Sequence, residues 1–501
     1  MIDKIARQHD RMVTLAIGMT IFMGAALFLA KIVFYTIDGD DPWFAEQAYW
    51  LAKDGVVRSG FFSTMLGYGT QQFAYHKLHI WIAALAIKIF GLSYLTLKFI
   101  TLGFFCVFLL VMRRYFYVFF GGQAKNHFVI LLAFILINSL AMELVFVYRP
   151  EMAIMCFGFI EFYFLRKSIE SGVRYSLLAG VFAGLCTLMH LNGVIFMVAG
   201  GVLLLADKRI KLTLWFSLAA GVVASFYFID VLPNHWATYW MQFRHDPAIP
   251  QGQFSVGTLV GRLFFEYNRF FGHGYESGYS LLVLAVIIAN YKSIWRQTEL
   301  RHALIYFIAL SVTLAAISPG KNHFHLLFGM PYIGILVAST VWQALNQNLG
   351  NARRRTLVGF SLLYILANIP HALAIINDGT HGTQGHHLVE ENAELMQHFH
   401  MQRGDKVLAP LDFIFNGIEQ VDIQGTNAFF TRSERGYIPQ TTEYFFKEAA
   451  ANHRKFILIF DYQLKKLEPY IKPVRDERYF GYTYLGNLHG YYVFKQSNDL
   501  H

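Results

Sequence analysis

Long apolar runs predict an α-helical integral membrane protein, and a change of composition near residue 377 predicts a small α/β domain after it. Hydrophobic residues make up 55% of the 501 residues, and charged residues make up only 15%. Soluble globular domains carry roughly a quarter charged residues. We therefore expect about eleven transmembrane helices in residues 1–377 and a soluble domain in residues 378–501.

The basic residues in short loops predict which way the helices run. Lys4, Arg7 and Arg11 precede the first apolar run, and short loops rich in lysine and arginine face the cytoplasm. Later basic clusters fall on alternate loops, as at Arg113-Arg114 and Arg353–Arg355. The net charge of +9 is therefore assigned to loops that orient the helices, and it does not indicate a nucleic-acid partner. The expected spans are about 12–37, 92–112, 127–147, 152–165, 175–190, 192–206, 212–232, 279–294, 303–318, 324–345 and 356–376.

This topology places residues 38–91 in the first outer loop. The stretch 75–91 is apolar but contains His76, Lys77 and His79, so we interpret it as a re-entrant or interfacial helix, with a full span as the alternative. Beyond residue 377, strand-length apolar runs at 407–409, 456–460 and 491–494 are separated by helix-like segments. This pattern predicts an extracytoplasmic α/β domain on the same side as the first outer loop.

Ionisable residues collect just beyond the predicted span ends on the outer side. Acids at the end of a transmembrane helix are costly unless they have a partner or a function. Structural explanations are also open: Asp41 before Pro42 has the form of a helix cap, Glu151 could pair with Arg149, and Lys321 could anchor lipid headgroups. The residues concerned are Asp40, Asp41, Glu46, His76, Lys77, Arg149, Glu151, Lys321, His323 and His325.

Carboxylates and cations at one membrane face suit chemistry on a phosphorylated lipid. Lysine and histidine side chains would hold the phosphate. A carboxylate would deprotonate an acceptor hydroxyl or amine as the phosphate leaves. The spacing of the residues therefore favours a group-transfer site at the outer surface.

The order of these groups resembles the membrane glycosyltransferases of the GT-C fold, near the protein O-mannosyltransferase and lipid A aminoarabinose transferase group. Asp40–Ala45 (DDPWFA) is similar to the family's acidic pattern D-[DE]-x-x-[YF]-A at the start of the first outer loop. In the segment His76–Gly91, Leu78-His79 stands where the family has two prolines. Arg149–Glu151 is similar to the family's R-P-D motif, with glutamate for aspartate, and Lys321–His325 to a basic segment before a late span. The resemblance covers the whole chain in order.

The resemblance implies a glycosyltransferase at the outer face of the cytoplasmic membrane, with the N-terminus in the cytoplasm. Its donor would be a polyprenyl-phosphate sugar, and its acceptor would be lipid A, another glycan or a protein of the envelope. Transfer would invert the anomeric carbon. Some relatives hold a divalent metal, which the carboxylates and histidines here could also bind.

The same resemblance implies roles for single residues. Asp40 would be the catalytic base or the carboxylate that orients the acceptor, and Glu151 would be the second acid, which helps to position the acceptor or a metal. The residues that would contact the donor phosphate are His76, Lys77, Lys321 and His325. The supporting residues would be Asp41, Glu46, Arg149 and His323.

Two other classes of protein compete with this interpretation. A transporter or flippase for lipid-linked sugars tends to place its charges and broken helices near the bilayer midplane, whereas the acids here lie at predicted span ends. A membrane scaffold with an outer binding domain would leave Asp40, Glu151 and Lys321 unexplained. We therefore favour a glycosyltransferase and keep the transporter as the alternative.

Overall fold

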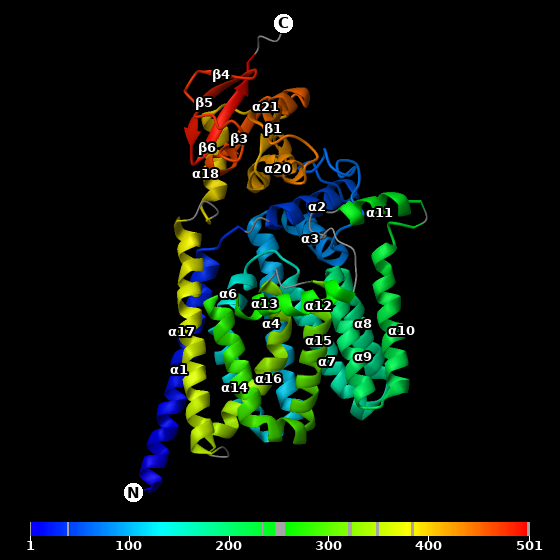
Figure 1. Cartoon of the computed structure of the whole chain (residues 1–501), viewed down its shortest axis with the longest axis vertical. Helices are drawn as coiled ribbons and strands as arrows, with labels where there is room; N and C mark the ends of the chain where they lie inside the picture. The colour runs from blue at the N-terminus through cyan, green and yellow to red at the C-terminus, as the bar shows by residue number, and fades with distance from the viewer. Residues whose placement is uncertain are drawn as a thin grey trace.

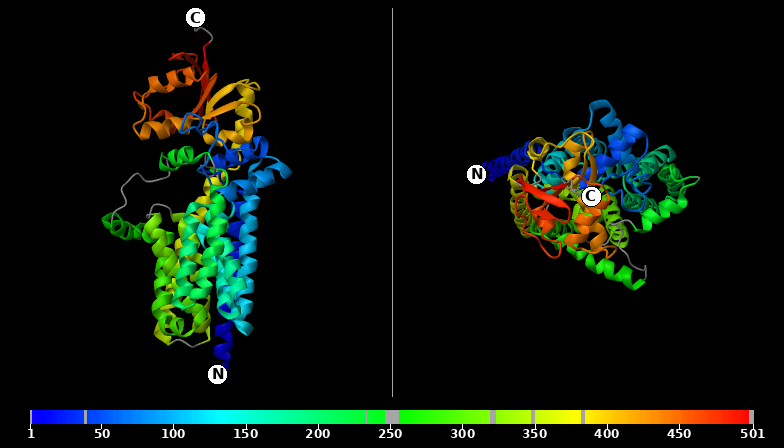
Figure 2. Two further views of the ribbon diagram at one scale, coloured as in Figure 1. Left: turned by 90° about the vertical axis from the view of Figure 1, so that its right-hand side faces the viewer. Right: turned by 90° about the horizontal axis from the view of Figure 1, so that it is seen from above.

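The chain folds into a helical bundle with a sheet-containing domain at one end. The computed structural model describes residues 2–37, 40–232, 234–245, 256–318, 323–346, 350–381 and 385–497. Figure 1 shows the N-terminus at the lower end of the bundle and the C-terminal domain above its upper end. Figure 2 shows the same arrangement from the side, and we call the upper end the domain end.

The helices of the bundle follow one another in the order of the predicted spans. Most are joined by short turns, as the predicted loops require. Their bounds are α1 (Ile2–Val33), α4 (Tyr94–Phe119), α5 (Ala124–Leu136), α6 (Ser139–Val145), α7 (Glu151–Ser171), α8 (Val173–Met189), α9 (Val194–Ala206), α10 (Ile210–Ser225), α14 (Gly274–Arg296), α15 (Thr298–Ile317), α16 (Leu326–Leu345) and α17 (Asn351–His381).

The membrane character of the bundle is confirmed, but the predicted count of about eleven spans is not. Within the described residues, 7 helices are long and apolar enough to cross a membrane. The helices α5 and α6 are bent by 77° relative to each other. If these two helices form one broken span, the number of candidate spans rises to 8. The helices α8 and α9 are apolar but shorter, and α7 carries charged residues along its length.

Shorter helices cover the domain end of the bundle. They are α2 (Asp40–Asp54), α3 (Lys77–Phe90), α11 (Trp236–His245), α12 (Val256–Phe265), α13 (Tyr267–Phe271) and the 3₁₀ turns η2 (Leu191–Gly193), η3 (Phe226–Phe228) and η4 (His323–His325). The turn η1 (Gly121–Gln123) lies at the opposite end of the bundle, between α4 and α5.

The helix α3 resolves the uncertain stretch 75–91. With 14 residues it is about 21 Å long, which is less than the roughly 30 Å of a bilayer core. Its small residues Ala83 and Ala84 pack in one hydrophobic cluster with Ala45 and Ala48 of α2. Figure 1 shows both helices between the bundle and the C-terminal domain. A short helix at the domain end agrees with the re-entrant or interfacial interpretation, not with a full span.

The C-terminal domain is built on one mixed sheet of the order β2-β1-β3-β6-β5-β4. The strand β1 is parallel to β2 and β3, and the remaining pairs are antiparallel. The strands are β1 (Lys406–Ala409), β2 (Asp422–Gly425), β3 (Phe456–Phe460), β4 (Arg478–Tyr479), β5 (Tyr482–Leu488) and β6 (Tyr491–Gln496). The helices are α18 (Leu388–His398), η5 (Leu411–Phe413), α19 (Ile414–Gly417), α20 (Thr426–Glu434), α21 (Thr442–Ala451) and α22 (Asp461–Leu464).

The first outer loop takes part in the core of this domain. Phe61 and Tyr68 are buried in the same hydrophobic cluster as Val407 and Ile423 of the sheet. The amide of Gly425 at the end of β2 donates to the carbonyl of Phe61 at 3.1 Å. The loop that begins with α2 is therefore held by the sheet, which fixes α2 relative to both the bundle and the domain.

Candidate active site

Arg149 bridges the two acids that the sequence places on different outer loops. Asp40 lies in the first turn of α2, and Glu151 lies in the first turn of α7. The Arg149 guanidinium donates to Asp40 Oδ2 through Nη1, to Glu151 Oε1 at 3.0 Å and to Glu151 Oε2 at 3.3 Å. The guanidinium also lies 4.8 Å from the ring centre of Phe324. Residues from three segments of the chain therefore meet at the domain end.

The two acids differ in their access to solvent. The Asp40 side chain is 44% exposed, whereas the Glu151 side chain is 4% exposed. Both oxygens of Glu151 accept hydrogen bonds from Arg149. Asp40 is thus the carboxylate that a substrate can reach, and Glu151 is placed to hold Arg149.

Asp41 is paired with a buried lysine that the sequence analysis did not select. Lys98 Nζ donates to Asp41 Oδ2 at 2.8 Å, to the Thr36 carbonyl at 2.8 Å and to the Phe146 carbonyl at 3.2 Å. Both side chains of the ion pair are almost fully buried. The pair attaches the start of α2 to α4, so Asp41 positions the helix that carries Asp40. A lysine inside an apolar run, which is costly to bury, was the signal that could have found it.

Neutral histidines line the same region. The rings of His76 and His190 stack with their centres 4.3 Å apart, and His79 stacks on Tyr148 at 4.2 Å. Burial lowers the pKa of His76 well below its ordinary value, the pKa of His79 to about 3 and that of His190 to about 4. Near neutral pH these imidazoles offer hydrogen bonds rather than positive charge. His190, between α8 and η2, is a second residue that the sequence analysis did not select.

Lys77 is occupied by a carboxylate. Its Nζ donates to both oxygens of Asp230, at 2.6 and 2.7 Å, and to the Phe73 carbonyl at 2.8 Å. These contacts use all three N–H donors of a lysine. Burial lowers the pKa of Lys77 to about 8, and Asp230 acts in the opposite direction. A phosphate would have to compete with Asp230 for Lys77.

Arg269 is a buried cation with unused donors. Its Nη2 donates to the carbonyl of Ser318, and its Nη1 forms an ion pair with Glu266 at 3.1 Å. Among the described residues, its Nε and Nη1 make no hydrogen bond. The Ser318 hydroxyl lies 3.4 Å from Nδ1 of His325. Arg269 on α13 and His325 on η4 therefore form one cluster, which the sequence analysis did not predict because α13 follows a long loop.

Two predicted residues of the late basic segment can be placed and one cannot. His323 and His325 belong to η4, and His325 is buried. The ring of His323 lies 5.8 Å from that of His273. Lys321 lies outside the described residues.

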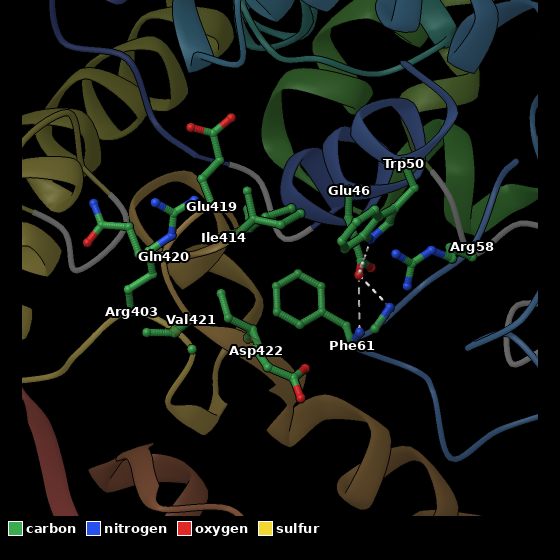
Figure 3. A pocket seen from close by; sticks show the side chains of 14 residues that line it. Glu46, Trp50, Arg58, Phe61, Arg403, Ile414, Glu419, Gln420, Val421 and Asp422 are labelled. Carbon is green, nitrogen blue, oxygen red and sulfur yellow. Dashed lines mark hydrogen bonds between the residues drawn. The ribbon is translucent and has the colours of Figure 1, made fainter. Parts of the chain in front are cut away.

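Glu46 accepts hydrogen bonds from the loop that follows α2. Its Oε1 accepts from the amides of Gly60 and Phe61, at 2.5 and 3.2 Å, and from Trp50 Nε1 at 3.2 Å. Its Oε2 accepts from the Ser59 hydroxyl at 2.5 Å, and Figure 3 shows this carboxylate among its donors. Burial raises the pKa of Glu46 to about 7 against the effect of these hydrogen bonds. Glu46 is thus bonded to its own loop and not to Arg149.

The arrangement of the acids does not suit a divalent metal. Arg149 occupies the position between the Asp40 and Glu151 carboxylates where a cation would be held. In the part of the chain that the structure describes, no group of three or more histidine, cysteine or acidic side chains has the geometry of a metal site. We therefore assign no step of the reaction to a metal.

Comparison with known proteins establishes the fold. No family model and no curated protein matches the sequence. The structure is similar to that of ArnT from Cupriavidus metallidurans bound to undecaprenyl phosphate, with a TM-score of 0.61 and 12% identity over 97% of this chain and 99% of that chain. It is also similar to the Archaeoglobus fulgidus oligosaccharyltransferase tethered with an acceptor peptide, with a TM-score of 0.54 and 13% identity over 96% of this chain and 74% of that chain.

A further structure of the Archaeoglobus fulgidus oligosaccharyltransferase, in complex with Zn and sulfate, has a TM-score of 0.51 at 12% identity, over 88% of this chain and 67% of that chain. At such identities the likeness concerns the fold. It confirms the GT-C architecture that the sequence predicted.

The buried pair of Lys98 and Asp41 gives a stability prediction. Lys98→Met leaves the Asp41 carboxylate buried without its cation, and we expect a loss of about 3–5 kcal/mol. The double variant Lys98→Met/Asp41→Asn removes both charges and should recover most of this loss. Unfolding of the purified proteins in detergent measures the difference. Equal stability of the two variants would contradict the ion pair.

Glu46 gives a pH prediction. Its pKa is raised in the fold, so the native state binds more protons than the unfolded state between about pH 4.5 and 7. The contribution of Glu46 to stability should therefore be full below about pH 4.5 and decline as the pH rises to about 7. The melting temperature of the wild type should fall relative to that of Glu46→Gln as the pH rises over this interval. A constant difference between the two proteins would refute the raised pKa.

Proposed function

We propose that the protein is a membrane glycosyltransferase that moves a sugar from a polyprenyl-phosphate donor to an acceptor of the cell envelope. The proposed site faces the outer side of the cytoplasmic membrane. The acceptor is lipid A, another glycan or a protein. The observation that carries the proposal is the exposed Asp40, held by Arg149 beside the buried Glu151 at the domain end of a GT-C bundle.

The proposed reaction is a direct displacement at the anomeric carbon. An acceptor hydroxyl or amine attacks this carbon and transfers its proton to Asp40, while the bond from the carbon to the phosphate oxygen breaks. The new bond forms on the opposite face of the sugar, so the configuration is inverted. Arg149 orients Asp40, and Glu151 in turn fixes Arg149 through two hydrogen bonds.

The leaving polyprenyl phosphate needs positive charge and hydrogen-bond donors. Arg269 supports this role best, because it is buried and has N–H groups that make no hydrogen bond among the described residues. His325 is connected to Arg269 through Ser318 and would add a neutral donor. Lys77 would take part only if the phosphate displaced Asp230. The undecaprenyl phosphate in the ArnT structure supports a donor of this chemical class.

One observation favours the alternative of a transporter. Glu161 lies halfway along α7, is fully buried, and accepts a hydrogen bond from the Tyr306 hydroxyl at 2.9 Å. A carboxylate in such a position is typical of a transport pathway. A transporter would move a lipid-linked sugar across proteoliposomes without breaking its bond to phosphate, and it would not depend on Asp40.

The role of Asp40 predicts the behaviour of Asp40→Asn. Loss of the base should lower kcat by about 10²- to 10⁴-fold, because general-base catalysis contributes about this much. Sugar transfer from radiolabelled donor lipid to envelope acceptor measures the effect, with the exposed Asp476→Asn as the matched control. Normal activity of the Asp40→Asn protein would show that Asp40 is not the catalytic base.

The role of Arg269 predicts a selective defect in donor binding. Arg269→Gln should raise the apparent KM for the donor lipid by about 10- to 100-fold, because charged hydrogen bonds to phosphate are lost. Arg296→Gln, at the end of α14 that lies away from α13, is the control and should leave this KM unchanged. If the donor KM of Arg269→Gln equals that of the wild type, Arg269 does not bind the phosphate.

A further inference from the structure

A pocket lies where the first outer loop meets the C-terminal domain. Its volume is about 380 Å³, and none of Asp40, Arg149 or Glu151 lines it. Figure 3 shows Glu46, Trp50 and Arg58 on one side of the pocket and Arg403, Glu419 and Gln420 of the C-terminal domain on the other. This size is that of a small-molecule site.

The wall formed by α2 and its loop is held in place by buried hydrogen bonds. Glu46 is only 3% exposed and accepts from Trp50 Nε1 and from the amides of Gly60 and Phe61. The Arg58 guanidinium lies 3.5 Å from the ring centre of Trp50. The aromatic wall is therefore formed before any ligand arrives, which lowers the cost of binding.

The lining combines an apolar floor with a polar rim. Phe61 and Ile414 are buried in the floor. Arg403, Glu419 and Gln420 are exposed at the rim. Arginine offers donors, glutamate offers acceptors, and glutamine offers both. A sugar ring matches this set, because its hydroxyls donate and accept while its C–H face packs on aromatic side chains.

Other ligand classes fit the pocket less well. The guanidinium groups of Arg58 and Arg403 are balanced by the carboxylates of Glu419 and Asp422, so the lining has no excess charge that would select a phosphate or a metal cation. A lipid chain would have to pass a charged rim to reach the floor. The mixed charges instead suit a neutral ligand with many hydroxyls.

We propose that this pocket binds a neutral sugar unit of the acceptor. The inference rests on the proposed glycosyltransferase function and narrows its acceptor to a molecule that already carries a glycan. The helix α2 connects the pocket to the proposed base, since it carries Asp40 in its first turn and the pocket residues Glu46 and Trp50 further along. A sugar seated in the pocket would orient the acceptor relative to the base.

The test uses the full-length protein in detergent. The donor is the mixture of polyprenyl-phosphate sugars extracted from cells of the source organism grown on radiolabelled glucose. The acceptor is the whole envelope fraction of the same cells, which contains both glycans and proteins that carry no glycan. Arg403→Ala/Glu419→Ala removes two exposed rim residues, so it should fold normally. The control, Glu443→Ala/Lys447→Ala, removes an exposed ion pair on α21.

The expected result is a rise of about 10- to 100-fold in the apparent KM for the acceptor in the rim variant. Its donor KM and melting temperature should stay at the wild-type values, and the control should match the wild type throughout. An unchanged acceptor KM, or an equal rise in the donor KM, would overturn the proposed sugar site.

The pattern of label transfer by the wild-type protein distinguishes a failure of the sugar site from a failure of the proposed glycosyltransferase function. If the wild-type protein transfers label only to protein that carries no glycan, the glycosyltransferase stands and the sugar pocket fails. If it transfers no label from any donor lipid to any acceptor, the proposed function itself fails.

Discussion

The hydrogen bonds from Arg149 to Asp40 and Glu151 are the interaction on which the site depends. Two carboxylates at helix starts would repel each other without a cation between them. The guanidinium is planar and has five donors, so it can hold both acids in a fixed geometry. Burial then separates their roles: Glu151 is enclosed and bonded twice, whereas Asp40 remains open to a substrate.

The number of N–H donors on each cation explains which one is suited to a phosphate. Lys77 and Lys98 each make three hydrogen bonds, so neither has a donor left. Both are better understood as structural: Lys98 fixes the start of α2, and Lys77 attaches α3 to Asp230. Arg269 has more donors than partners among the described residues. A buried donor without a partner is costly, and an anionic ligand would relieve that cost.

The C-terminal domain contributes to the site through the first outer loop. Phe61 and Tyr68 pack in the core of the sheet domain. The amide of Phe73 donates a hydrogen bond to Gln242 Oε1 of α11 at 2.7 Å. The first outer loop therefore contacts both the sheet domain and α11. These contacts fix the position of α2 and, with it, that of Asp40 in its first turn.

The sequence by itself determined the membrane class, the order of the bundle helices and the placement of Asp40, Arg149 and Glu151 at one end of the bundle. It could do so because apolar run length and loop charge are local properties, and because the motifs lie next to helix starts. Only the tertiary structure decided the partners of buried charges. Lys98 and Asp41 are 57 positions apart, and Lys77 and Asp230 are 153 apart. Which lysines have all their donors engaged depends on contacts between distant segments, and no local pattern encodes those contacts.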